Sequence, residues 1–272
     1  MKLKDLLTVT FGTFVLIVLG DGVVANVGLA PRLAGTGYNW NTITIGWAVA
    51  VFVSIWVSGG DHNPAFTLAG ALQGSMSFGQ AFIRIVCQMI GAFLGAGAVY
   101  LVYRGGLIAA GMPNVWSTGP GSVFGSTFWG ATGTGITSTG TYSLVTACMA
   151  EFFGVLMVAW AIRAGSDSRN SALSRLGGLI VAMTVLGVGL CLGGPSGYSL
   201  NPARDLGPRL FGLLAGTQGL FDGIYWLLPP VLVPFIAAPI GYYLYDVLLK
   251  TEEKANLEGA IPHPSRPSDL RL

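Results

Sequence analysis

The sequence predicts an all-α membrane protein with six transmembrane helices and two re-entrant half-helices, arranged as an inverted repeat. Of its 272 residues, 52% are hydrophobic and only 10% are charged, with a mean hydropathy of +0.65. A soluble domain usually carries about 25% charged residues, so most of this surface is expected to face lipid. The 41 glycines fit the same class, because small residues let membrane helices pack closely.

Six apolar segments approach the length of about 20 residues that a transmembrane helix needs. They cover residues 6–30, 42–58, 79–103, 144–162, 176–194 and 224–249. The second and fifth are marginal in length, which favours helices in close contact with protein. The first is interpreted as a retained span, because no small-residue cleavage pattern closes a short apolar region.

Two further apolar segments, 62–73 and 200–213, are too short to cross a membrane. Each follows the second span of its half, so both halves consist of two spans, a short segment and a third span. The repeats cover about 6–103 and 144–249 and form one channel domain over residues 1–250. Three spans per half place the second repeat upside down, and broken helices in inverted repeats are typical of transport proteins.

Lysine and arginine are concentrated in the segments that share a side with the two termini, which predicts that both termini are cytoplasmic. The connector 104–143 is then extracellular. It is rich in Gly, Ser and Thr, and we assign it no chemistry. The polar tail 251–272 contains several prolines and is predicted to be a disordered cytoplasmic segment.

Both short segments open with the same tripeptide. The copies are Asn63, Pro64, Ala65 and Asn201, Pro202, Ala203. Asn is a favoured helix N-cap and Pro a favoured first helical residue, so a single copy would indicate only a helix start. Such a tripeptide is expected roughly 0.04 times in this length from average usage, and two copies at equivalent places indicate a function.

In an inverted repeat, the two half-helices enter from opposite faces and meet start to start. Their positive dipole ends then point to the midplane and oppose cations and protons. The side-chain amides of Asn63 and Asn201 can donate hydrogen bonds to a passing oxygen. A neutral solute that carries hydroxyl groups fits both properties.

The paired tripeptide within six spans resembles the major intrinsic protein (aquaporin) family over roughly residues 6–250. The resemblance implies a right-handed helical bundle, a homotetramer with one pore in each subunit, and a place in the cell membrane. Asp205 and Arg209, which follow the second tripeptide, resemble the glycerol-facilitator branch; they also suit a local i, i+4 ion pair. The implied function is a passive channel for glycerol and small polyols with water, and the alternative is a water-dominant or poorly conducting member.

The family narrows at an outer selectivity filter of aromatic residues and one arginine. Arg204 matches that arginine, although an arginine at this depth could also extend to the headgroups. Tyr198 matches a position that is Phe in glycerol channels. Trp47 resembles the filter tryptophan. The alternatives are that Trp47 belongs to the interfacial belt, or that Trp40 or Trp56 is the filter tryptophan instead.

The fourth wall of the filter is expected near Gly189 or Leu190, and the sequence does not choose between them. Glu151 matches the buried glutamate that braces the second re-entrant loop. Val9 stands where the first half would carry the corresponding glutamate, so the first loop is predicted to lack this brace.

The first re-entrant loop departs from the family pattern. The residues before Asn63 read Ser-Gly-Gly-Asp-His, where Ser-Gly-Ala-His-x is usual, and the loop is several residues short. Asp61 would be a costly charge near a pore mouth unless it is hydrated or paired, with His62 as one possible partner. Asp21, late in the first span, is a second membrane-level charge without a clear role.

Other classes of function are poorly supported. The net charge is +2 without a basic cluster, so nucleic acid is not an expected partner. His62 and His263 are the only histidines, which excludes a multi-histidine metal site, and no cofactor is implied. No Gly-x-Ser-x-Gly motif suggests a serine enzyme. The expected partners are glycerol, water, small polyols and membrane lipid.

Overall fold

The computed structural model describes residues 2–29, 39–124, 142–167 and 176–249. Helices dominate these ranges, in agreement with the predicted all-α class. The helices are α1 (Leu3–Leu29), α2 (Trp40–Ser58), α3 (Pro64–Leu72), α4 (Phe78–Ala109), α6 (Leu144–Gly165), α8 (Gly177–Leu192), α9 (Pro202–Ala215), the π-helix η3 (Leu228–Leu232) and α10 (Val233–Leu249). The predicted tail 251–272 and part of the connector lie outside the described residues.

Five helical segments of the described chain are long and apolar enough to cross a membrane: α1, α2, α4, α6 and the continuous stretch Leu228–Leu249. They correspond to five of the six predicted spans. The fifth predicted span is α8, an apolar helix of 16 residues, which reaches about 24 Å against a hydrocarbon core of about 30 Å. Its marginal length agrees with the expectation from the sequence.

Helix α4 continues to Ala109, six residues beyond the predicted span. It begins at a capping box in which Ser77 and Gln80 satisfy each other's backbone N–H groups. The span predicted from the sequence ends at residue 103. The last turns persist because Leu107 is fully buried, and the chain turns at Gly111 with φ 74°.

The last predicted span does not begin as a regular α-helix at residue 224. Residues Leu228–Leu232 form a π-turn, in which the N–H of Leu232 donates to the carbonyl of Leu227 at 3.0 Å. Pro229, Pro230 and Pro234 each lack a backbone N–H, so a complete α-helical ladder is impossible here. Regular helix resumes at Val233 and continues to Leu249.

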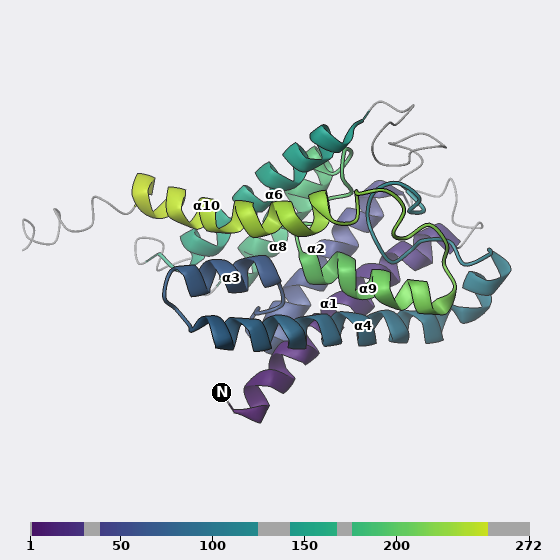
Figure 1. Cartoon of the computed structure of the whole chain (residues 1–272), viewed down its shortest axis with the longest axis horizontal. Helices are drawn as coiled ribbons and strands as arrows, with labels where there is room; N and C mark the ends of the chain where they lie inside the picture. Colours follow the sequence, from purple (N-terminus) through teal and green to yellow (C-terminus); the bar gives the residue numbers. More distant parts are fainter. Residues whose placement is uncertain (1, 30–38, 125–141, 168–175, 250–272) are drawn as a thin grey trace, which may run out of the picture.

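The two halves are interlocked through their short helices. α1 packs against α2 and α4, and α6 packs against α8 and α10. The half-helix α3 packs against α10 of the other half, while α9 packs against α4. Figure 1 shows α3 and α9 end to end between α10 and α4, with their first residues near the centre of the molecule. This is the arrangement that an inverted repeat predicts.

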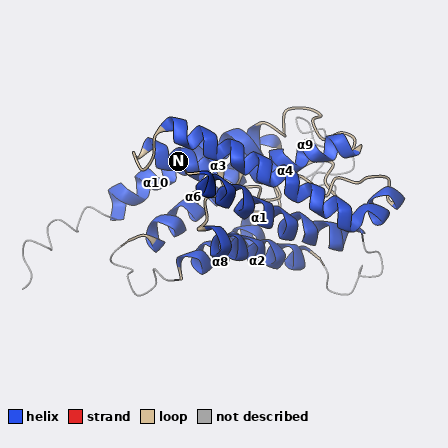
Figure 2. Ribbon diagram, turned by 90° about the horizontal axis from the view of Figure 1, so that it is seen from below, coloured by secondary structure: helices blue, strands red, loops and turns tan. Residues whose placement is uncertain are grey.

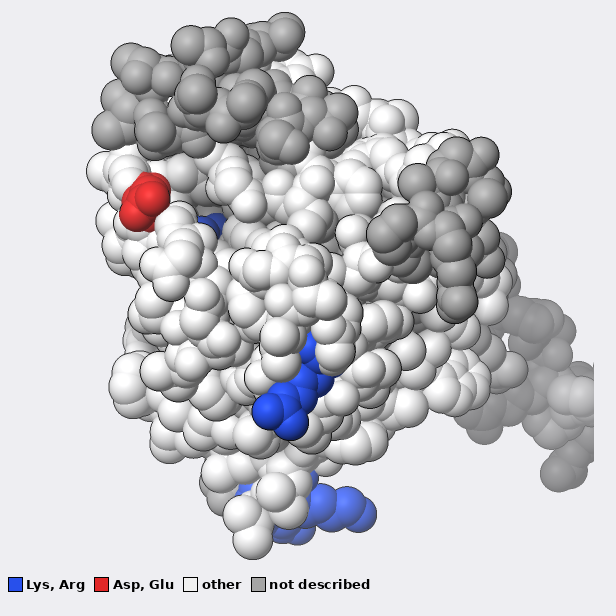
Figure 3. Space-filling model, turned by 90° about the vertical axis from the view of Figure 1, so that its right-hand side faces the viewer, with Lys and Arg blue, Asp and Glu red and all other residues white. Residues whose placement is uncertain are grey.

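Small residues allow the helices to approach closely. Gly95 of α4 lies against α1, where an added Cβ would be 2.9 Å from the carbonyl oxygen of Phe14. The outward faces are apolar: Leu101 and Val102 are 76% and 75% exposed. Seen from the right-hand end of Figure 1, the surface in Figure 3 is mostly uncharged, with few Lys, Arg, Asp or Glu side chains. Such a surface suits lipid.

The chain enters and leaves the bundle at the same end. In Figure 1 the N-terminus and the last turn of α10 both lie at the left, where α3 also ends and α4 begins. Figure 2 shows the same helices from below, with the end of α10 again at the left and the spanning helices along the long axis. The first and last helices of the described bundle therefore start and end at the same end of the molecule.

Candidate functional site

The half-helices begin at the two Asn-Pro pairs. The Asn63 side-chain oxygen accepts a hydrogen bond from the N–H of Ala65 at 3.0 Å, with Pro64 at the first helical position. The Asn201 side-chain oxygen accepts from the N–H of Ala203 at 3.0 Å and of Arg204 at 3.3 Å. Each asparagine thus uses its oxygen to cap a helix.

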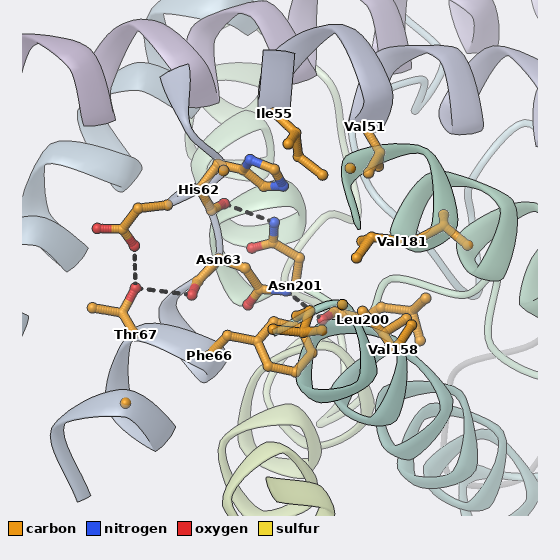
Figure 4. A pocket seen from close by; sticks show the side chains of 18 of the residues that line it. Val51, Ile55, His62, Asn63, Phe66, Thr67, Val158, Val181, Leu200 and Asn201 are labelled. Carbon is orange, nitrogen blue, oxygen red and sulfur yellow. Dashed lines mark hydrogen bonds between the residues drawn. The ribbon is translucent and has the colours of Figure 1, made fainter. Parts of the chain in front are cut away.

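The amide nitrogens of the same side chains link the two halves. Asn63 Nδ2 donates to the carbonyl of Leu200 at 2.9 Å, and Asn201 Nδ2 donates to the carbonyl of His62 at 2.9 Å. The second of these bonds is drawn in Figure 4. A carboxamide carries two N–H donors, so one on each asparagine remains for a solute.

A cavity of about 570 Å³ runs past these helix starts. Asn63 and Asn201 provide its polar side. Val51, Val158 and Val181 line the opposing side, as Figure 4 shows. A solute here meets amide donors along one wall and hydrocarbon along the other.

Two arginines line the end of the cavity near the chain termini, and both are paired. Arg84 of α4 pairs with Asp61, and Arg163 of α6 pairs with Asp246 of α10. The charges at this mouth are therefore balanced.

The other end of the cavity brings together Trp47, Tyr198 and Arg204, which the sequence proposed as filter residues. The Arg204 guanidinium carbon lies 3.9 Å from the centre of the Trp47 ring. Its Nη1 lies 3.5 Å from the carbonyl oxygen of Trp116. This end of the cavity is thus lined by aromatic rings and a cation held in place by protein contacts.

The rival residues lie elsewhere. Trp56 is 78% exposed, and the indole of Trp40 donates to the carbonyl of Gly189 at 3.0 Å, outside the cavity wall. Leu190 is 51% exposed on the outer surface. Gly189 is buried, and an added Cβ would lie 3.0 Å from Tyr198 Cζ. Of the two residues left open, Gly189 is the one that adjoins the aromatic wall.

Glu151 of α6 holds the loop that precedes α9. Its two carboxylate oxygens accept hydrogen bonds from the N–H groups of Ser199 and Leu200, each at 2.7 Å. Tyr198 and Leu200 have φ values of 42° and 57°, which non-glycine residues rarely adopt. The buried carboxylate compensates this strain and fixes the position of Tyr198.

Asp205 and Arg209 form the predicted i, i+4 pair, with Arg209 Nη2 2.7 Å from Asp205 Oδ1. The pair also binds the connector: Thr118 donates to Asp205 Oδ2 through its N–H at 2.8 Å and its hydroxyl at 2.7 Å. Arg209 in turn donates to the carbonyl of Thr118 at 3.2 Å.

Sequence reasoning missed the role of residues 114–118, because it assigned the connector no chemistry. This stretch carries Trp116, which is fully buried and whose indole donates to Thr217 at 3.0 Å, and Thr118 beside Asp205. The signal in the sequence was a tryptophan in a segment otherwise composed mostly of small polar residues.

The first loop has a brace of a different kind. Asp61 accepts hydrogen bonds from Thr67 at 2.7 Å and from Gln88 at 2.8 Å, besides its ion pair with Arg84. The suggestion that His62 pairs with Asp61 is wrong, since the structure gives Asp61 these three partners. His62 Nδ1 lies instead 3.3 Å from the hydroxyl of Ser54.

Two half-helices that meet start to start beside a continuous cavity, inside a bundle of apolar spanning helices, define a membrane channel. The chain matches the profile of the major intrinsic protein family over residues 1–245, and it belongs to that family. The resemblance seen in the sequence is thereby confirmed.

Several relatives are similar over most of the chain. A probable aquaglyceroporin-2 from Gibberella zeae is 33% identical over 254 residues, which are 91% of this chain and 73% of the relative. A probable glycerol uptake facilitator protein from Thermotoga maritima is 35% identical over 246 residues, 87% and 96% of the two chains. The crystal structure of the aquaglyceroporin from Plasmodium falciparum superposes with a TM-score of 0.76 at 26% identity, over 91% of this chain and 97% of that one.

Proposed function

We propose that this protein is a passive channel for glycerol and other small neutral polyols, which also conducts water and excludes ions and protons. The observation that carries the proposal is the Arg204 guanidinium stacked 3.9 Å from the Trp47 ring at the end of the cavity lined by Trp47 and Tyr198. The Trp47 and Tyr198 rings line the cavity and suit the carbon edge of a polyol, and the guanidinium offers fixed donors to its hydroxyls. Relatives named as aquaglyceroporins and glycerol facilitators support the same solute.

Gly189 favours glycerol over water alone. A side chain there would press on Tyr198, so the glycine leaves room for the Tyr198 ring in the cavity wall. The remaining amide donors of Asn63 and Asn201 then receive hydroxyls at the midplane. The positive ends of α3 and α9 meet at the same place and oppose cations, which supports a channel for neutral solutes.

The topology within the cell membrane belongs to the proposal as well. Lys2 and Lys4 lie at the start of α1, Arg84 lies near the start of α4 and Arg163 lies in the last turn of α6, so these charges share the end of the bundle where α1 and α4 begin. By the positive-inside rule, this end is cytoplasmic. We further propose one channel domain over residues 1–250 and a homotetramer with a pore in each subunit, which native mass spectrometry of the detergent-solubilised protein would test.

Uptake of radiolabelled glycerol into proteoliposomes tests the proposed solute. Uptake should exceed that of empty liposomes, should stop at the equilibrium concentration, and should not respond to a membrane potential. Accumulation above equilibrium would contradict a passive channel. Water conduction without glycerol uptake would indicate the water-dominant alternative.

A further inference from the structure

Arg204 contacts the protein through Nη1 and through one planar face of its guanidinium group. Nη1 lies 3.5 Å from the carbonyl oxygen of Trp116 and 3.6 Å from Asp21 Oδ1, and the planar face rests on Trp47. These contacts leave the hydrogens on Nε and Nη2 for a solute in the cavity that Arg204 lines. Asp21 therefore lies beside Nη1, away from the Nε and Nη2 hydrogens that remain for a solute.

Asp21 is fully buried in α1. Within the described part of the chain, neither of its carboxylate oxygens has a hydrogen-bond partner. A buried carboxylate at membrane depth is costly unless a countercharge compensates it. Among the described residues, the countercharge beside it is Arg204, whose Nη1 lies 3.6 Å from Asp21 Oδ1.

The neighbouring glycine explains how α1 brings a charge to this place. Gly20 lies directly against the six-membered ring of Trp47, and any side chain there would overlap the ring. Trp47 is thus held between α1 on one side and Arg204 on the other. The same close approach sets Asp21 beside the guanidinium.

The pair changes the charge of the constriction. Arg204 alone would make it positive, and an ionised Asp21 beside Arg204 would offset that charge. The nearby Arg209 is likewise balanced by Asp205. A neutral constriction leaves the repulsion of cations to the positive starts of α3 and α9.

We propose that Asp21 is a specificity-determining residue of this channel, which positions Arg204 from behind and neutralises its charge. The inference rests on the proposed function. It has a specific consequence: when Arg204 is replaced by a short apolar residue, a bare carboxylate faces the constriction. Such a carboxylate attracts protons and cations, so the proton leak caused by replacing Arg204 should depend on Asp21.

Proton flux separates this role from a purely structural one. The full-length protein and its variants are reconstituted into liposomes with a pH-sensitive dye, and a potassium gradient with valinomycin sets the membrane potential. We compare wild type, Arg204→Val, Arg204→Val with Asp21→Asn, and Arg204→Val with Asp222→Asn. Asp222 is an exposed acid on the loop before η3 and serves as the matched control.

Arg204→Val should conduct protons above the level of empty liposomes, and adding Asp222→Asn should leave that flux unchanged. Adding Asp21→Asn should lower it about tenfold, since a buried charge in a low-dielectric cleft changes the local counter-ion concentration by at least that factor. Asp21→Ala in place of Asp21→Asn gives a second removal of the same charge if the first double variant does not reconstitute. Equal proton flux with and without Asp21, or no flux in Arg204→Val, would overturn the proposal.

Glycerol flux of the wild type in the same liposomes keeps the two claims apart. Absence of glycerol flux together with the predicted proton fluxes would reject glycerol as the solute and retain the role of Asp21. Glycerol flux in the wild type without any dependence of the proton leak on Asp21 would retain glycerol as the solute and reject the role of Asp21.

Discussion

The side-chain amide of Asn201 donates a hydrogen bond to the backbone carbonyl of His62 at 2.9 Å, across the two halves of the bundle. Asn63 makes the reciprocal bond to Leu200. Both asparagines also cap their own half-helices. A single residue type at each helix start therefore joins the halves, caps the helix and keeps one donor for the solute.

Asn201→Ala should lower stability more than the loss of a helix cap alone. A cap is worth about 1 kcal/mol, and an unsatisfied buried acceptor at His62 adds about 1–3 kcal/mol. Thermal unfolding in detergent measures the difference. Asn39→Ala is the matched control, because Asn39 caps α2 at an exposed position and is not among the residues that link the half-helices. Equal destabilisation by both substitutions would show that the cross-link contributes nothing.

Gly189→Ala should reduce the ratio of glycerol to water permeability. The new methyl group would lie 2.8 Å from Thr44 Cγ2 and 3.0 Å from Tyr198 Cζ, so Thr44 and the Tyr198 ring of the cavity wall must shift to make room. One methyl group in a fitted site is worth about tenfold in discrimination. Stopped-flow light scattering gives both permeabilities. Gly187→Ala on the same helix meets no atom within 4 Å and should leave the ratio unchanged. An unchanged ratio in Gly189→Ala would remove Gly189 from the constriction.

Glu151→Gln should weaken the second loop. A carboxamide offers one acceptor oxygen, so one of the N–H groups of Ser199 and Leu200 would face an amide donor. The expected cost is about 1–3 kcal/mol, with reduced glycerol flux because Tyr198 loses its fixed position. Cys148→Ala, about one turn earlier on α6, is the control. Wild-type flux and stability in Glu151→Gln would show that the loop does not need the brace.

Asp61→Asn should loosen the first half-helix. The substitution removes the charge and the oxygen Oδ2 that pair with Arg84, and it leaves one amide oxygen in the place of Oδ1, to which Thr67 and Gln88 both donate. We expect lower glycerol flux with a stability loss of about 1–2 kcal/mol, since the pair is only partly exposed. Asp5→Asn, an exposed acid at the start of α1, should behave as wild type. A wild-type phenotype in Asp61→Asn would leave the first loop without an identified brace.

Much of this architecture follows from local sequence. Asn and Pro at a helix start have strong positional preferences, so the starts of α3 and α9 could be placed to the residue. The pair of Asp205 and Arg209 follows from helical spacing. By contrast, the end of α4 depends on the burial of Leu107, a tertiary contact.

The contacts that the sequence could not supply join residues far apart in the chain. Asp21 meets Arg204, Trp116 meets Arg204, and Thr118 meets Asp205. Each depends on how α1 and the connector fold over α9, which no local pattern encodes. The brace at Asp61 escaped notice for the same reason, because Gln88 and Arg84 come from α4, beyond the half-helix that follows Asp61.

Stopped-flow light scattering on proteoliposomes, with glycerol and water gradients in parallel, measures whether this pore conducts glycerol. Wild-type protein should give glycerol permeability well above empty liposomes. Arg204→Ala and Tyr198→Ala should change the ratio of glycerol to water permeability, because both side chains line the same end of the cavity. No glycerol flux above empty liposomes, or ratios identical in all three proteins, would contradict the assignment of this constriction as a glycerol filter.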